Sequence, residues 1–317
     1  MRGYLLRRLG QSIAVLLLVI FMVFILSHLL PGGARSLLSP QASPSVVRHF
    51  MKVNGYDKPI LVQFFIYLSQ LAHGNLGYSY TNNATVTALL AEALPRTGIL
   101  VGLAYIVGLV VAVPLGAIQA LRRNKLADHI LSIGVIISYS MPQFWLGMLF
   151  ILYFAIRLHI FPPEGPQGGI VQTLTSNPLS LVLPVLTLAP GTFAVFARFM
   201  RSSAIEALVQ DYIRTARAKG ASNRRILRRH VLRNAMLPTI TLIGLSLPGV
   251  ISGAVIVESL FNYPGMGLLF WKAAVVHDYP LLLGFTLIVA VATIAGSLIA
   301  DLLYGVADPR MRVGGSK

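Results

Sequence analysis

The sequence predicts an all-α, polytopic integral membrane protein with six transmembrane helices. Composition is the first reason: 56% of the 317 residues are hydrophobic and only 11% are charged, whereas soluble domains carry ~25% charged residues. The second reason is a set of apolar runs free of Lys, Arg, Asp and Glu, each close to or above the ~20 residues that a spanning helix needs. These runs cover residues 9–30, 98–121, 129–156, 181–197, 238–257 and 281–300.

The first apolar run is predicted to be an uncleaved membrane span. Arg2, Arg7 and Arg8 precede it, which is also typical of a secretory signal. Its apolar stretch is longer than the ~7–15 residues of a signal core. Removal as a signal is the alternative, and the later spans are predicted in either case.

Residues 31–97 are too long for a simple connection and carry a helical pattern of their own. Apolar residues repeat with helical spacing between residues 60 and 71, and residues 73–77 offer the turn chemistry that ends a helix. A second short helix is expected at residues 85–94, with Pro95 opening the next span. The segment is interpreted either as a docking surface for an external partner or as a structural cap over the bundle.

Proline interrupts several of the runs, which favours a conduit whose helices move. Met141-Pro142 breaks the third run and Pro248-Gly249 breaks the fifth. Backbone groups freed at membrane depth are tolerated only where they are buried in protein or face water. Candidate pathway residues are Ser138, Tyr139, Ser140, Gln143, Ser246 and Ser252, and for each one the alternative is a satisfied kink in a packed bundle. Gly98 and Gly102 are expected to form a small-residue face for close helix contact.

Basic residues divide unequally across the predicted spans. With the N-terminus in the cytoplasm, 19 of the 26 Lys and Arg lie in the inner segments 1–8, 122–128, 198–237 and 306–317. The positive-inside rule therefore predicts that both termini are cytoplasmic. This distribution, together with attraction to anionic membrane lipid, accounts for the formal charge of +16 without a nucleic-acid partner.

The sequence indicates no catalytic chemistry of its own. A charge at the centre of a span costs ~2.5–3.5 kcal/mol, and Glu258 and Asp301 stand only at span ends, where they are interpreted as caps or interface anchors. The chain has no Cys, no Gly-Lys pair of a P-loop and no HExxH sequence. We therefore expect no enzyme activity, no metal and no cofactor on this chain. If the protein works uphill, the energy must come from a partner.

A basic segment at residues 201–237 lies between two predicted spans. Residues 206–219 are expected to form a short helix that Gly220 ends, and Ser222 is expected to cap a second basic helix that runs to Asn234. Three interpretations compete: a loop held against anionic lipid, a DNA-binding helix-turn-helix, and a docking element for a cytosolic motor. A two-helix hairpin tethered between spans lacks the third helix of the DNA-binding motif, so that interpretation is the weakest.

Residues 211–220 read DYIRTARAKG and residues 229–238 read RHVLRNAMLP. Both resemble the cytoplasmic coupling loop of bacterial ABC importer permeases, in the form typical of the dipeptide, oligopeptide and nickel branch. The general family pattern has Glu where this chain has Arg214. Sequences similar to this branch recur along the whole chain, while Gly33 and Asn75 stand where the family usually has Asp.

The resemblance implies an ABC importer permease (MetI-like) core with a cytoplasmic coupling helix. The expected parts are a first span with an extracytoplasmic loop at 1–97, a permease core at 98–305 that contains the coupling loop 201–237, and a cytoplasmic tail at 306–317. Contact with the ATPase is then expected at Asp211, Tyr212, Arg214, Thr215, Ala216, Arg217, Lys219 and Gly220.

The same resemblance implies partners and a location. The partners are expected to be a second homologous permease, two cytosolic ATP-binding subunits that hold ATP and Mg, and an extracytoplasmic substrate-binding protein, all at the bacterial inner membrane. Di- or oligopeptides are the expected substrates, with nickel, haem and oligosaccharide as alternatives. An autonomous channel or receptor without an ATPase is the alternative from another class.

Overall fold

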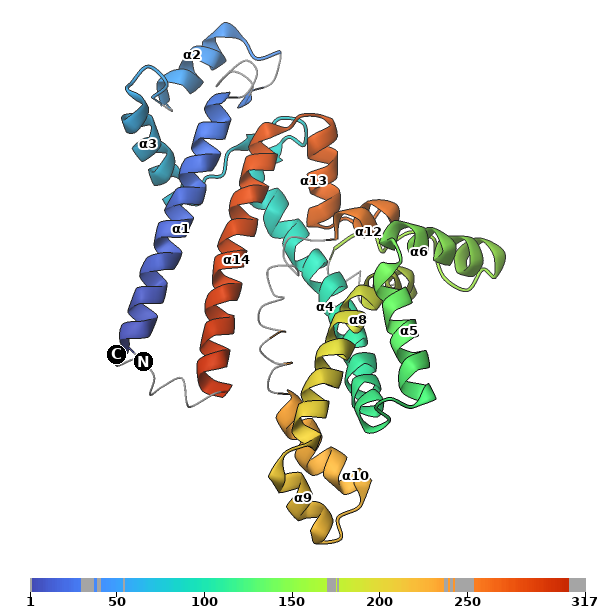
Figure 1. Ribbon diagram of the computed structural model, residues 1–317. Helices are drawn as coiled ribbons and strands as arrows, with labels where there is room; N and C mark the ends of the chain where they lie inside the picture. The colour runs from blue at the N-terminus through green and yellow to red at the C-terminus, as the bar shows by residue number, and fades with distance from the viewer. Residues whose placement is uncertain are drawn as a thin grey trace.

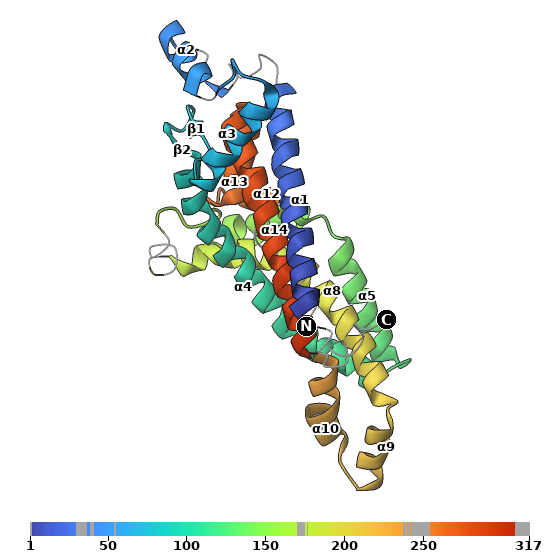
Figure 2. The same cartoon turned by 90° about the vertical axis from the view of Figure 1, so that its left-hand side faces the viewer.

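The structure is a computed structural model, and it describes residues 2–29, 37–38, 41–53, 55–169, 175, 177–236, 239, 242 and 254–307. Long helices form the middle of the molecule (Figure 1). In the view turned by 90°, short helices lie at one end of these long helices and a helical hairpin projects from the other (Figure 2). The predicted all-α class is confirmed, with a two-stranded ribbon as a small addition.

Within the described ranges, four stretches of helix are long and apolar enough to cross a membrane. They lie in α1 (Arg2–Leu29), α4 (Val86–Leu121), η3 (Pro178–Leu181) with α8 (Val182–Leu208), and α14 (Tyr279–Ala307). A bent pair of helices gives a fifth span if its two legs are counted as one. Most of the apolar run at 238–257 lies outside the described residues, so the count of six stays a prediction.

The break predicted at Met141-Pro142 is confirmed. α5 (Leu126–Ser140) ends just before it, and α6 (Gln143–Phe150) with η2 (Ile151–Arg157) follows at an angle of 96°. Met141 has extended backbone, with ψ at 126°, because a residue before proline is disfavoured in the helical region. The bend turns the second leg away from the axis of the first.

α4 begins earlier than the sequence predicts. It is one continuous helix, so the short helix expected at 85–94 and the span expected from 98 are a single element. Thr85 caps its start, because the hydroxyl oxygen accepts a hydrogen bond from the Ala88 N–H at 3.3 Å. The expectation that Pro95 opens the span is wrong: Pro95 lies inside the helix. Proline removes only one backbone donor, and membrane helices tolerate this where neighbouring groups satisfy the freed carbonyl.

α4 and α8 make the most extensive helix contact among the described elements. A Cβ at Gly108 would lie 2.9 Å from Thr192 Cγ2, and a Cβ at Gly116 would lie 2.7 Å from the Ala197 carbonyl oxygen. Glycine therefore allows the two backbones to approach closely, as small residues do in other membrane helix pairs. The contact face predicted at Gly98 and Gly102 does not form within the described part of the chain, where a Cβ at either position would meet no atom within 4 Å.

The segment before α4 contains α2 (Pro44–Val53), α3 (Ile60–Ala72) and the ribbon of β1 (Tyr78–Ser79) with β2 (Ala84–Thr85). The helix predicted from apolar spacing is confirmed as α3, and positive φ angles at Gly74 (75°) and Gly77 (100°) mark the predicted turn. The apolar spacing at residues 60–71 predicts α3 only, and α2 was not predicted. The Phe64 ring of α3 lies 5.3 Å from the Phe24 ring of α1, so α3 packs on the bundle as a structural cap would.

Two short helices, α12 (Val255–Leu260) and α13 (Met266–Val275), are joined by a buried turn. The Glu258 carboxylate is fully buried and accepts hydrogen bonds from the N–H of Gly267 at 2.6 Å and of Leu268 at 3.1 Å. Thr97 of α4 donates to the same carboxylate at 2.8 Å. Glu258 thus caps the start of α13, which confirms its interpretation as a cap. The side chain of Asp301 lies outside the described part of the chain.

Candidate functional site

The basic segment after α8 folds into a helical hairpin that projects from one end of the bundle (Figure 1). Its first arm is α9 (Asp211–Ala218). Its second arm is α10 (Asn223–Ile226), which continues through η4 (Leu227–Val231) and helical residues 232–236. The predicted pair of helices is therefore confirmed, and we call residues 211–236 the α9–α10 hairpin.

The first arm starts later than the sequence predicts. Glu206 belongs to α8, which ends at Leu208, so the helix expected at 206–219 is divided. Gln210 separates the two helices with extended backbone (φ −72°, ψ 150°). Its carbonyl oxygen accepts a hydrogen bond from the Ile213 N–H at 3.0 Å, so Gln210 serves as the N-cap residue of α9. The break allows α9 to leave the axis of α8.

The predicted stop at Gly220 is confirmed, with φ at +78°. The Gly220 N–H donates to the Arg217 carbonyl at 2.9 Å, and the Ala221 N–H donates to the Ala216 carbonyl at 3.0 Å. This pair of bonds is a Schellman motif, which satisfies the last carbonyls of a helix and needs a left-handed residue. The predicted cap at Ser222 is also confirmed, because its hydroxyl accepts from the Arg225 N–H at 3.4 Å.

One side of the hairpin is buried against the bundle. Ile213 of α9, Ile226 and Val231 of the second arm are fully or almost fully buried. They share one apolar cluster, the hairpin core, with Ala117 of α4 and Met200 of α8. Burial of each such side chain stabilises the contact by ~1.5–3 kcal/mol. The hairpin is therefore held to the ends of α4 and α8.

The opposite side of α9 is exposed. Asp211 and Arg214 approach each other at 3.5 Å, but their side chains are 94% and 78% exposed, and such a pair contributes little to stability. Thr215 donates its hydroxyl proton to the Asp211 carbonyl at 3.0 Å. Of the predicted ATPase-contact residues, those exposed are Asp211, Tyr212, Arg214, Thr215, Arg217, Lys219 and Gly220. We call this set the α9 face.

Two of the predicted contact residues also serve the hairpin itself. Ala216 is half-buried and packs against the hairpin core. The Tyr212 hydroxyl accepts a hydrogen bond from the Asn234 amide at 3.0 Å, which joins the two arms. Their residue types are thus explained in part by packing between the arms. The second arm adds exposed arginines, namely Arg224, Arg225, Arg228 and Arg229.

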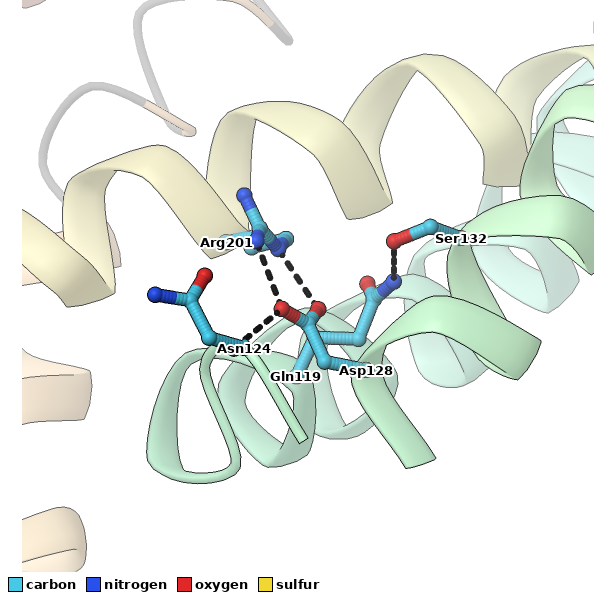
Figure 3. A network of polar contacts seen from close by, with 5 residues as sticks. All are labelled: Gln119, Asn124, Asp128, Ser132 and Arg201. Carbon is cyan, nitrogen blue, oxygen red and sulfur yellow. Dashed lines mark hydrogen bonds and ion pairs between the residues drawn. The ribbon is translucent and has the colours of Figure 1, made fainter. Parts of the chain in front are cut away.

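A polar network lies near the base of the hairpin, where α4, α5 and α8 meet (Figure 3). Arg201 of α8 donates two hydrogen bonds to the Asp128 carboxylate of α5, at 2.9 and 2.7 Å. The Asn124 N–H donates to the same carboxylate at 3.1 Å. Beside this pair, Gln119 of α4 donates to the Ser132 hydroxyl of α5 at 3.1 Å. The network therefore connects three helices.

The Arg201–Asp128 pair is partly shielded from water, because the side chain of Asp128 is 2% exposed and that of Arg201 is 32% exposed. Removal of one partner from a buried pair costs ~3–5 kcal/mol, and exposure of Arg201 places this pair toward the lower end. The sequence does not reveal it, since the two residues are 73 positions apart. The one local signal is that a single carboxylate, Asp128, closely follows the basic residues Arg122, Arg123 and Lys125.

Among the predicted pathway residues, Gln143 lines a cavity of about 340 Å³. Its other walls come from α4 and α8, including Tyr105, Thr192 and Phe196, and from Ala254 at the start of α12. Ser138 donates its hydroxyl proton to the Gly134 carbonyl of its own helix at 2.9 Å, which fits the satisfied-kink alternative. Tyr139 and Ser140 are exposed on the same helix.

Ser246 and Ser252, with Pro248-Gly249, lie outside the described residues. In the ranges that the structure does describe, no group of three or more His, Cys, Asp or Glu side chains is placed to hold a metal ion.

Two family models match the sequence. One, described as the binding-protein-dependent transport system inner membrane component, matches residues 112–313, and another, for the N-terminal part of this membrane component, matches residues 1–101. The chain belongs to this permease family. The permease is 36% identical over 314 residues to the oligopeptide transport system permease protein AppB of Bacillus subtilis, covering 98% of this chain and 99% of the relative.

Further relatives and a solved structure agree with the assignment. The permease is 34% identical over 337 residues to the dipeptide transport system permease protein DppB of Escherichia coli, covering 98% and 99% of the two chains. It also superimposes on a chain of the inward-facing MetNI methionine ABC transporter with a TM-score of 0.51 at 17% identity, covering 68% of this chain and 96% of that chain. This likeness shows the importer-permease fold predicted from the resemblance. The permease is thus a multi-pass inner membrane component of a transport system.

Proposed function

We propose that this permease forms half of the translocation pathway of an ATP-driven importer of di- or oligopeptides. Relatives named as peptide permeases align with nearly its whole length, which supports the substrate class. The observation that carries the coupling role is the α9–α10 hairpin, whose buried side is fixed to α4 and α8 while the α9 face is exposed. An element that is anchored on one side and open on the other suits contact with a motor subunit.

In this proposal two cytosolic partner subunits bind ATP and Mg, and this chain binds neither. Their surface meets the α9 face, and a second homologous permease completes the pathway. Closure of the ATPases displaces α9, and the hairpin core passes that displacement to α4 and α8 because all three share it. The spans then rock between inward-open and outward-open arrangements.

The proposed orientation places the hairpin and both termini in the cytoplasm. Residues 1–97 then form the first span with an extracytoplasmic part, residues 98–305 form the permease core, and residues 306–317 form a cytoplasmic tail. The outer part, which includes α2 and α3, faces the extracytoplasmic binding protein that delivers the substrate. The basic second arm of the hairpin lies near anionic lipid headgroups, and the proposal includes no nucleic acid.

Cysteine labelling tests this orientation. The chain contains no Cys, so a single introduced Cys reports its own side of the membrane. Arg225→Cys should react with an impermeant maleimide only after the membrane is opened, because Arg225 is exposed on the hairpin. Gln167→Cys, on an exposed loop before α8, should react in intact cells. The reversed pattern would exclude the orientation.

ATP hydrolysis tests the division of labour between subunits. The assembly purified through this chain is expected to contain a P-loop subunit and to hydrolyse ATP, whereas the chain alone should show no turnover above background. Turnover by a preparation free of ATPase subunits would contradict the proposal, and absence of any ATPase partner would favour the autonomous channel or receptor. ATP-driven uptake of nickel, haem or oligosaccharide in place of peptides would contradict the proposed substrate class but would leave the proposed mechanism unchanged.

A further inference from the structure

We propose that the ion pair between Arg201 and Asp128 is a positioning contact that makes α5 follow α8 when the α9–α10 hairpin moves. The inference rests on the proposed coupling function and adds to it two residues that lie outside the α9 face. Its consequence is that the bent pair of α5 and α6 carries motion from the hairpin toward the cavity at Gln143.

On the α8 side, Arg201 belongs to the same rigid element as the base of the hairpin. α8 is continuous from Val182 to Leu208, and its buried residues Met200 and Ala204 are part of the hairpin core. A Cβ at Gly116 of α4 would lie 2.9 Å from the backbone nitrogen of Arg201. The backbone at Arg201 is therefore closely held between α4 and the hairpin, and it moves with them.

On the α5 side, few other buried contacts hold the helix. Of its 15 residues only Asp128 and Val135 are buried. The exposed apolar side chains of this helix are Leu126, Ile130, Ile133, Ile136, Ile137 and Tyr139. Asp128 is thus the buried attachment nearest the hairpin, and the two-pronged guanidinium contact fixes direction as well as distance. The Gln119–Ser132 hydrogen bond supports the same junction one turn along α5.

The far end of α5 leads to the cavity. α5 ends at Ser140, and after the 96° bend α6 begins with Gln143. Gln143 faces Gly191 of α8, where a Cβ would lie 3.6 Å from the Gln143 amide nitrogen. α8 therefore meets α5 at the Arg201–Asp128 pair and meets α6, which follows α5 after the bend, at the cavity wall. A change in the position of α5 relative to α8 alters this wall, and the ion pair determines whether that change follows the hairpin.

The test uses the complete assembly and replaces Asp128 by Asn, which keeps the size of the side chain and removes its charge. ATP consumed and tritiated di- to pentapeptide imported are measured on the same vesicles. We expect hydrolysis to continue while the ATP used per peptide rises about tenfold, the scale of a typical coupling free energy. Arg201→Lys keeps the charge but loses the two-pronged guanidinium contact, so its rise in ATP used per peptide should be smaller than that of Arg201→Gln.

Glu92→Gln is the matched control. It removes a carboxylate that pairs at 2.7 Å with Arg96 of the same helix, while Arg96 keeps its own hydrogen bond to the Pro264 carbonyl at 3.3 Å. No hydrogen bond between helices is removed directly, so the ratio of ATP to peptide should equal that of the unaltered chain. The proposal is overturned if Asp128→Asn leaves the ratio unchanged. It is also overturned if hydrolysis and uptake fall together in proportion to the amount of assembled protein, which is what a merely structural contact predicts.

A second measurement is independent of ATPases and substrate, so it separates failure of this inference from failure of the proposed function. Spin labels are attached to the full chain at Lys125→Cys, at the start of α5, and Arg217→Cys, on the α9 face. The distance distribution between them should be narrow in the unaltered background and clearly broader with Asp128→Asn. Equal widths would show that the ion pair does not fix α5 to the hairpin, whatever the protein transports.

Discussion

Gly220→Val is expected to abolish substrate uptake while the chain still inserts into the membrane. A Cβ at Gly220 meets no atom within 4 Å, so the cost is confined to the backbone, where φ is +78°. A left-handed conformation costs an L-residue ~1–2 kcal/mol, and a β-branched one more. Since ~1.4 kcal/mol is a factor of ten in an equilibrium constant, the equilibrium between the docking-competent form of the hairpin and its alternatives should shift at least about tenfold toward the alternatives.

The measurement compares uptake and the amount of ATPase subunit that copurifies with the chain. Gly220→Asn is the matched control, because Asn adopts the left-handed region far more readily than Val, and it should keep most of both. If Gly220→Val transports normally, the hairpin does not couple to a motor. Ala216→Trp should also abolish uptake and weaken copurification, but Ala216 packs on the hairpin core, so this variant does not separate docking from hairpin stability.

The second large effect is expected at Glu258. Glu258→Ala leaves the buried N–H groups of Gly267 and Leu268 without the acceptor they have at 2.6 and 3.1 Å. Each unsatisfied buried donor costs ~1–3 kcal/mol, so the yield of folded protein in detergent should fall about tenfold or more. Size-exclusion chromatography after heating, with the unaltered chain beside it, measures the loss.

The variant Glu258→Gln distinguishes between two roles of the Glu258 side chain, as a helix cap and as a proton carrier. The Gln carbonyl oxygen can accept from the N–H of Gly267 and Leu268, while its amide faces the Thr97 hydroxyl. We therefore expect near-normal yield and uptake with Gln. Normal yield combined with loss of uptake would show that the charge of Glu258 takes part in transport, which would contradict an energy source located only on partner subunits.

Local sequence patterns predicted the parts of the molecule that depend on neighbouring residues. Gly220 and Ser222 determine the turn of the hairpin through their own backbone bonds, and Met141-Pro142 produces the bend through a steric effect on one residue. The contact residues of α9 were expected from the family resemblance, and all of them except Ala216 are exposed. The role of these residues in coupling to the ATPase stays a prediction.

Features that depend on distant residues did not follow from the sequence. Proline at position 95 has the same local chemistry as at a helix start, but packing keeps α4 continuous through it. Small residues at Gly98 and Gly102 look equivalent to Gly108 and Gly116, and only the path of α8 decides which pair is in contact. The Arg201–Asp128 pair is likewise produced by the meeting of α5 and α8.

Peptide uptake into sealed vesicles tests the central claim most directly. The permease is reconstituted with its second permease, its ATPase subunits and its binding protein, and tritiated di- to pentapeptides are supplied on the binding-protein side with ATP on the hairpin side. We predict accumulation against a gradient that requires ATP and the ATPase subunits and is lost with Gly220→Val. Peptide accumulation that is equal without ATP or without the ATPase subunits would contradict the account.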